Sequence, residues 1–248
     1  MRRFFVEDID GDIVEISGSE AHHIKNVLRR KKGDAVFLFD GKGNEYTAEI
    51  ERLSDKEIEL KVLSKIQKNS EPKIKINLFQ SIPKLKKFDF IVEKSTELGV
   101  SEIIPVITER TNYNVAAERR YAKLSHWKKI ALSASKQCGR TVVCEICSVT
   151  NFQDAVKSVC ISENPSKSIS LIPWECEQKN TLKNVLKICN LQSVICNLFV
   201  GPEGGFSNAE IELAEKCGVI PVTLGKRILR TETAPIVVIS NILYELES

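Results

Sequence analysis

Two loops near the end of the sequence carry the residues best suited to ligand binding. The first is the segment GPEGGFS at 201–207, which follows the apolar run 198–200, and the second is GKRILRTETAP at 225–235, which follows the apolar run 219–224. Strands of an open α/β sheet that end in such loops expose unpaired backbone N–H groups, and these sheets bind ligands there. Two such loops so close in sequence indicate one composite pocket.

The glycines of the first loop narrow the choice of ligand. Gly204 and Gly205 allow a positive φ angle and a close approach of the backbone to a flat ligand. The loop lacks the glycine spacing of a dinucleotide-binding fingerprint and the Lys-Ser/Thr pair of a P-loop, so a phosphate-binding role is not favoured. An ordinary turn between a strand and a helix is the alternative, because every α/β protein needs such turns.

Alternating strands and helices are expected after Pro72. Apolar runs predict strands, and apolar residues at helical spacing between them predict amphipathic helices. The expected strands are 74–80, 103–107, 169–172, 194–200 and 219–224, and the expected helices are 88–98, 127–138, 182–189 and 207–218. Ser207 and Glu210 form a capping-box pattern at the start of the last helix. This alternation is typical of a parallel sheet with helices on both faces.

The last segment, 235–246, gives conflicting signals. Residues 236–239 have strand propensity, whereas Thr233 and Pro235 suit the N-cap and the first turn of a helix. Because the segment is apolar on most sides, we expect a helix that is buried against the sheet or against a partner subunit.

The first seventy residues have a different pattern of predicted secondary structure, with short strands in place of alternating strands and helices. Short β-branched or aromatic runs separated by glycine-containing turns predict strands, and one short helix fits 19–30. The expected strands are 12–16, 35–39, 45–50 and 57–63. This pattern is typical of a small β-barrel, and the polar segment 65–73 suits a linker.

A basic cluster lies within this first region. Residues 25–32 contain five Lys or Arg side chains and no acid. Such a cluster can neutralise the phosphates of a nucleic acid. It can also be a solvated helix end whose cations complement the helix dipole before Gly33. The residues alone favour the solvated helix end, which is the usual fate of such charge runs.

Composition argues against membrane-spanning and disulfide-rich secreted classes. The 248 residues are 42% hydrophobic and 28% charged with a net charge of +3, which fits one large or two modest globular domains. No apolar run reaches the length of a membrane span and the first residues do not resemble a signal peptide, so we expect a cytoplasmic protein. Of the eight cysteines, only Cys144 and Cys147 have a zinc-like spacing, and no second pair matches them. Free cysteine commonly acts as a small buried hydrophobe, and we expect no metal.

The two loops together resemble one specific family. GPEGGFS combined with LGKRILRTETA is similar to the ribosomal RNA small subunit methyltransferase E family, within the SPOUT class of knotted methyltransferases. The stretch 172–175 matches this family only loosely, and cysteine is more frequent than in the family, notably at Cys138. The similarity otherwise extends along nearly the whole chain, through Met1–Val6, His23–Arg29, Gly33-Asp34, Glu93–Gly99 and Gln137–Arg140.

The resemblance implies an α/β fold with two domains. Residues 1–72 would form a PUA-like β-barrel that helps to hold RNA, and residues 73–248 would form a SPOUT methyltransferase domain with a C-terminal trefoil knot. S-adenosylmethionine would bind in the knot as cofactor, and the active unit would be a homodimer. The implied reaction is methylation of N3 of a uridine at position 1498 of 16S rRNA, with the assembled 30S ribosomal subunit as partner.

The resemblance also implies which residues form the active site. Arg230 would stabilise charge that develops on the uracil, and Glu232 and Glu203 would accept its N3 proton or orient the base. Capping of a helix, or ion pairs with Arg227 and Arg230, is the alternative for both carboxylates. The cofactor would contact both loops, at Gly201, Gly204, Gly205, Leu224, Gly225, Ile228 and Leu229, although the three aliphatic side chains could instead belong to the core.

RNA would be held mainly through its phosphates. His22 and His23 could contact RNA or pack the predicted helix. Two other functions fit the sequence, namely a SPOUT enzyme with a different RNA target and a non-catalytic RNA-binding protein, but the intact second loop argues against the latter. The cationic side chains implied for phosphate contact are Arg2, Arg3, Lys25, Arg29, Arg30, Arg110 and Arg140.

Overall fold

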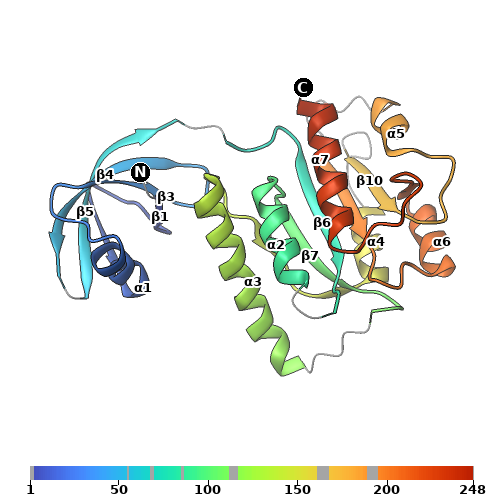
Figure 1. Ribbon diagram of the computed structural model, residues 1–248, viewed down its shortest axis with the longest axis horizontal. Helices are drawn as coiled ribbons and strands as arrows, with labels where there is room; N and C mark the ends of the chain where they lie inside the picture. Colours follow the sequence, from blue (N-terminus) through green and yellow to red (C-terminus); the bar gives the residue numbers. More distant parts are fainter. Residues whose placement is uncertain are drawn as a thin grey trace. The chain divides into compact units, whose positions relative to one another are not determined.

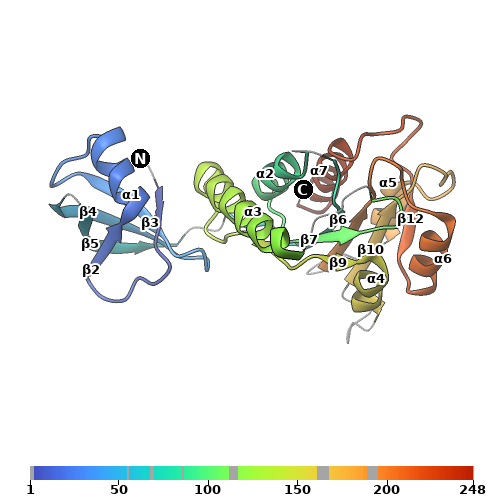
Figure 2. The same ribbon diagram turned by 90° about the horizontal axis from the view of Figure 1, so that it is seen from below.

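The computed structural model describes residues 3–54, 56–67, 70–84, 87–111, 117–160, 168–188 and 195–247. The chain forms two compact units (Figures 1 and 2). The first consists of Met1–Glu71 and Ser135–Val143, and the second of Pro72–Ala134 and Cys144–Ser248. The sequence predicts a single boundary after residue 72, which would place residues 135–143 in the second domain. In the structure these residues belong to the first unit.

The first unit contains a mixed sheet of five strands in the order β1-β3-β4-β5-β2. β1 is parallel to β3, and the other neighbours are antiparallel. Within the described residues the edge strands β1 and β2 do not pair with each other, so the sheet is a half-barrel and not the closed barrel that the strand pattern predicts. The strands are β1 (Arg3–Phe5), β2 (Ile13–Ser17), β3 (Ala35–Phe39), β4 (Glu45–Leu53) and β5 (Glu57–Ile66).

The helix predicted at 19–30 forms in two parts and ends earlier. α1 (Gly18–His22) is a short α-helix, and η1 (His23–Val27) continues it as a π-helix. The backbone N–H of Leu28 donates to the carbonyl of His23 at 2.9 Å, which is the wider turn of a π-helix. Arg29 follows with a left-handed φ of 51°, so the helix does not continue to Arg30.

The second unit is built on a seven-stranded sheet in which every pairing is parallel, as predicted. The strand order is β12-β10-β11-β6-β7-β8, and β9 also pairs with β7. Because the strands are parallel, β10, β11 and β12 all end at the same edge. The strands are β6 (Lys75–Ser81), β7 (Glu102–Ile107), β8 (Glu145–Ile146), β9 (Thr150–Asn151), β10 (Ser168–Pro173), β11 (Ile195–Val200) and β12 (Ile220–Val222).

Helices cover both faces of this sheet (Figure 2), and each face has its own hydrophobic core. One core joins the sheet to α2 (Lys87–Glu97), α3 (Ala117–Cys138), α5 (Leu182–Ile188) and α7 (Thr233–Glu247). The other joins it to α4 (Phe152–Cys160) and α6 (Asn208–Lys216). This layering confirms the predicted α/β class for the second unit.

Several local predictions are confirmed. Ser207 and Glu210 form a reciprocal capping box, because the Ser207 Oγ accepts from the Glu210 N–H at 3.3 Å and the Glu210 carboxylate accepts from the Ser207 N–H at 2.9 Å. The last segment is helical, and α7 buries Val238, Ile239 and Ile242 fully in the core. Cys189 and Val194, which end one predicted helix and begin one predicted strand, lie outside the described residues.

One helix and three short strands are absent from the prediction. Phe152, Ala155 and Val156 of α4 are buried at helical spacing, and the Asn151 side chain accepts from the Asp154 N–H at 2.8 Å as an N-cap. The signal for α4 was therefore present in the sequence. β1, β8 and β9 have two or three residues each, which is too short for a periodic pattern. Among the described helices, none is long and apolar enough to cross a membrane.

Candidate functional site

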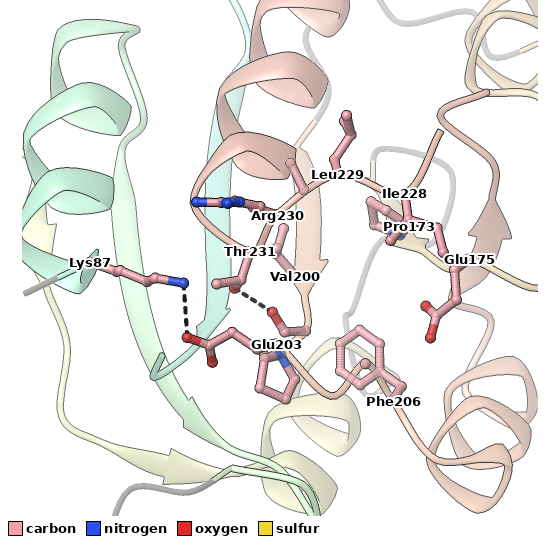
Figure 3. Close-up of a pocket in the computed structure, with 14 residues that line it drawn as sticks. Lys87, Pro173, Glu175, Val200, Glu203, Phe206, Ile228, Leu229, Arg230 and Thr231 are labelled. Carbon is pink, nitrogen blue, oxygen red and sulfur yellow. Dashed lines mark hydrogen bonds and ion pairs between the residues drawn. The ribbon is translucent and has the colours of Figure 1, made fainter. Parts of the chain in front are cut away.

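A pocket of about 340 Å³ lies where β10 and β11 end (Figure 3). It is formed by the loop after β11, the loop before α7 and the first residue of α2. A smaller pocket of about 110 Å³ adjoins it and shares Pro173, Glu175, Ile228, Leu229 and Ala234 with it. The larger pocket is lined by Lys87, Pro173, Glu175, Val200, Gly201, Pro202, Glu203, Gly205, Phe206, Ile228, Leu229, Arg230, Thr231 and Ala234.

A buried threonine joins the two loops. The Thr231 Oγ1 donates to the carbonyl oxygen of Gly201 at 2.7 Å (Figure 3). Thr231 is 5% exposed, and its Oγ1 accepts from the Gln80 Nε2 at 3.3 Å. The Gln80 amide also donates to the carbonyl of Ser81 at 2.9 Å, at the end of β6. Both loops are thus fixed to the edge of the sheet, and they form one composite pocket as the sequence predicts.

Glycine is favoured at three pocket positions, by a left-handed backbone at Gly205 and Gly225 and by a close aromatic neighbour at Gly201. Gly205 has a φ of +66°, and a Cβ there would lie 2.3 Å from the Glu175 Oε1. A Cβ on Gly201 would lie 3.0 Å from the Phe206 ring. Gly225 has a φ of +110° and lines the smaller pocket. Gly204 lines neither pocket, and its carbonyl accepts from the Arg110 Nη1 at 2.8 Å.

The second loop supplies the apolar wall. Ile228 and Leu229 line both pockets, and Leu224 lines the smaller one. Ile228 is 84% exposed, so it is not a core residue. Leu224 is partly buried and packs against the core under α7, so it serves both the core and the pocket wall. Pro173 and Glu175 come from the stretch 172–175, whose loose match to the family gave no reason to expect them here.

The charged groups of the site form a network around Lys87. The Lys87 Nζ lies 3.1 Å from the Glu203 Oε1 and 3.2 Å from the Glu232 Oε2, so one ammonium group pairs with a carboxylate from each loop. The backbone N–H of Lys84 also donates to Glu203, at 3.2 Å. The Arg230 Nη1 lies 4.0 Å from the Glu232 Oε1, and the Arg230 side chain is 82% exposed. Lys87 is absent from the sequence prediction because no spacing links it to Glu203, 116 residues away.

These contacts set the protonation of two groups. Burial raises the pKa of the Glu203 carboxyl, but hydrogen bonds from its own backbone, from Lys87 and from Lys84 outweigh burial and lower the pKa overall. The hydrogen bond to Glu203 is the main cause of a raised pKa at Lys87. At neutral pH the pocket therefore presents an ammonium group and an ionised Glu203 side by side.

Two of the predicted RNA contacts are buried in the first unit instead. The Arg3 guanidinium pairs with Glu45, donates to the carbonyl of Arg140 at 2.9 Å and lies 4.7 Å from the centre of the Phe39 ring. The Arg140 guanidinium is 5% exposed and pairs with Glu71 at 2.7 Å. Their charges are thus paired inside the unit, and the structure does not present them on the surface, where the predicted phosphate contact would place them.

The remaining predicted RNA contacts differ in exposure. Arg29 is exposed, Arg30 is half-buried and lies 3.7 Å from Asp34, and Lys25 donates to the carbonyl of Ser54 at 3.4 Å. Arg110 is exposed near the first loop. Arg2 lies outside the described residues. Within the described part of the chain, no group of His, Cys, Asp and Glu side chains is arranged to hold a metal ion.

Comparison with known sequences identifies the family. The RNA methyltransferase domain family matches residues 69–243, and the RNA methyltransferase PUA domain family matches residues 16–63. Ribosomal RNA small subunit methyltransferase E of Buchnera aphidicola (subsp. Schizaphis graminum) is 35% identical over 92% of this chain and 89% of its own length. The Bacillus subtilis protein of the same name is 33% identical over 100% of this chain and 98% of its own length.

The chain belongs to the ribosomal RNA small subunit methyltransferase E family. Solved structures agree with this assignment. The Neisseria gonorrhoeae member of the methyltransferase E family, bound to S-adenosylmethionine, has a TM-score of 0.87 with 33% identity and covers 98% of this chain and 97% of its own. A Legionella pneumophila protein in complex with the same cofactor has a TM-score of 0.86 with 32% identity, over 98% of this chain and 96% of its own.

Proposed function

We propose that this chain transfers the methyl group of S-adenosylmethionine to N3 of uridine 1498 of 16S rRNA, on the assembled 30S subunit. We also propose that it acts in the cytoplasm as a homodimer, that its second unit is a SPOUT domain with a trefoil knot formed by the two pocket loops, and that its first unit helps to hold RNA. One observation carries the proposal: the two loops of the family motif meet in one pocket, joined by Thr231 and Gly201.

The pocket suits the proposed cofactor. S-adenosylmethionine has a flat base, a ribose and an amino acid end, which need apolar contact and a few polar anchors. The exposed Ile228 and the partly exposed Leu229 offer the apolar surface. Gly201, Gly205 and Gly225 let backbone groups come close to the ligand without a side chain in between. Gly204 would act indirectly, through its bond to Arg110.

The cofactor supplies an electrophilic methyl group, so the protein mainly has to orient the uracil and manage its N3 proton. We assign the proton to Glu203 or Glu232, which are held by Lys87 at the pocket. The carboxylate would accept the proton from N3, and the N3 lone pair would form the bond to the methyl carbon while the methyl–sulfur bond of the cofactor breaks and its electron pair stays on sulfur, which leaves as the neutral thioether S-adenosylhomocysteine. Arg230, which lines the pocket with an exposed side chain, would stabilise the negative charge on the uracil oxygens.

The phosphates of the rRNA would contact exposed cations. Four cations remain candidates because they are at least partly exposed, namely Arg29, Arg110, Arg30 and Lys25. Such contacts position RNA without reading its sequence.

The proposal is tested by nucleoside mass spectrometry of 16S rRNA from cells that lack the gene. We expect the loss of one N3-methyluridine, restored by the wild-type gene and not by a variant with the pocket impaired, such as Gly205→Ala. An unchanged set of methylated nucleosides would contradict the proposed target. Calorimetry with S-adenosylmethionine separates this outcome from loss of enzyme function altogether, because a non-catalytic relative would not bind the cofactor.

A further inference from the structure

Helix α3 carries a surface that the active site does not use. Residues 119–129 contain five Lys or Arg residues and no Asp or Glu, and all of them lie in α3. A shallow hollow of about 260 Å³ runs along the helix. It is lined by Tyr121, Leu124, Ser125, Lys128, Lys129 and Leu132, which we call the Tyr121 face.

The Tyr121 face adjoins the side of α3 that packs into the core, and its Leu124 also packs partly against that core. Trp127 and Ala131 are buried against the sheet and α2, and Asp89 of α2 accepts hydrogen bonds from Trp127 and binds His126 on that side. Tyr121, Ser125, Lys128 and Leu132 follow one another at helical spacing and form a single stripe. Figure 1 shows the first turns of α3 extending beyond the beginning of α2.

The aromatic ring on this face is open to solvent. Tyr121 is 81% exposed, next to two partly exposed leucines, Leu124 and Leu132. Lys128 and Lys129 are exposed on the same face. An exposed ring beside apolar side chains and flanked by cations matches the way in which proteins hold single-stranded nucleic acid, with a base stacked on the ring and phosphates on the cations.

We propose that the Tyr121 face binds unpaired nucleotides of the rRNA substrate, with a base stacked on Tyr121 and phosphates on Lys128 and Lys129. The inference rests on the proposed function for the identity of the RNA. Charge complementarity favours RNA as the occupant. A second copy of the same face would bring Lys128 and Lys129 against their counterparts, and such like charges disfavour a symmetric protein contact.

The test measures binding of a single-stranded 16S rRNA oligonucleotide by fluorescence anisotropy at several salt concentrations. Tyr121→Ala should weaken binding about tenfold, and Tyr121→Phe, which keeps the ring, should bind as the wild type does. The double variant Lys128→Glu/Lys129→Glu should weaken binding and make the slope of log K against log salt shallower by about one to two. Lys183→Glu/Lys187→Glu, on exposed positions of α5, is the charge-matched control and should change neither.

Cofactor affinity measured by calorimetry should be the same in all variants, which shows that the fold is intact. The proposal would be overturned if both Tyr121→Ala and Lys128→Glu/Lys129→Glu bound the RNA oligonucleotide with wild-type affinity. It would also be overturned if the α5 control lost as much RNA affinity as these variants. A change in the sedimentation mass of Lys128→Glu/Lys129→Glu would instead identify a protein interface and also overturn it. The proposed function is tested separately: if wild-type protein binds the RNA through this face but methylates no uridine, only the function fails.

Discussion

The Thr231 hydroxyl donates a 2.7 Å hydrogen bond to the carbonyl of Gly201, and this bond joins two loops that are thirty residues apart in sequence. Gln80, at the edge of the sheet, donates to the same hydroxyl. Because Thr231 is almost fully buried, both bonds are shielded from water. Thr231 is therefore one of the side chains that hold the two loops of the pocket together, beside the Lys87 ion pairs.

Thr231→Val tests this role, since valine keeps the shape of threonine and removes the hydroxyl. The Gly201 carbonyl and the Gln80 amide would each lose a partner, so we expect the free energy of unfolding to fall by about 1–3 kcal/mol and cofactor affinity to fall as well. Urea unfolding and calorimetry measure the two effects. Thr231→Ser retains the hydroxyl and should preserve both values; equal cofactor affinity in the valine and serine variants would refute the role of the bond.

Lys87→Met should change the pH dependence of catalysis. The pKa of the Glu203 carboxyl is lower in the folded protein than in the unfolded chain. The ionised carboxylate therefore stabilises the fold at pH values above the pKa of the unfolded chain, and this stabilisation is lost as the pH falls through the pKa of the folded protein. Without the ammonium group the pKa of Glu203 rises, and the acidic limb of kcat/KM should move to higher pH. Lys87→Arg keeps the charge and should restore the wild-type limb.

The pKa of Glu203 can also be measured directly, by NMR titration of ¹³C-labelled glutamate in the wild type and in Lys87→Met. This measurement does not depend on the RNA substrate. Superimposable titration curves would show that Lys87 does not set the charge of the site.

Gly205→Ala and Gly218→Ala form a matched pair. Both glycines have left-handed backbone, with φ of +66° and +79°, so each substitution should cost about 1–2 kcal/mol of stability. Only at Gly205 would the new Cβ meet a neighbour, the Glu175 carboxylate at the pocket. We expect calorimetry to show weaker cofactor binding for Gly205→Ala alone. Comparable losses in both variants would mean that the effect is general strain.

Substitution of Arg140 should lower the stability of the fold, whereas substitution of Arg29 should weaken RNA binding. Arg140→Met leaves the Glu71 carboxylate without its buried partner, so unfolding should require about 3 kcal/mol less, by urea titration. Arg29→Met should leave stability unchanged, because Arg29 is exposed, and should weaken RNA binding in a salt-dependent manner. If Arg140→Met lost RNA affinity but kept its stability, Arg140 would be an RNA contact after all.

Much of the second unit could be predicted because its strands and helices have strong local patterns. The apolar run of β11, the capping box at Ser207 and the buried α7 each follow from residues within one turn or strand. The half-barrel could not be predicted, because whether β1 and β2 pair depends on curvature and not on local sequence. The sequence predicts one short helix at 19–30, and the π-helical turn at His23 has no simple signal.

In the candidate site, too, some features follow from local sequence and others only from the tertiary structure. The two loops were recognisable from their glycines and from the family motif, whereas Lys87 reaches the site only through the fold. The burial of Arg3 and Arg140 likewise depends on carboxylates, Glu45 and Glu71, that are distant in sequence. Positive charge in a sequence identifies candidate phosphate contacts, but only tertiary structure shows which charges are already paired.

The most direct test is reconstitution of the reaction. Purified protein and S-adenosylmethionine are added to 30S subunits from cells that lack the gene, and the 16S rRNA is digested and mapped by mass spectrometry. We predict one methyl group per subunit, on N3 of uridine 1498, and a strongly reduced yield with Gly205→Ala. Methylation of another nucleotide or another ring atom, or none at all by protein that binds the cofactor, would contradict the account.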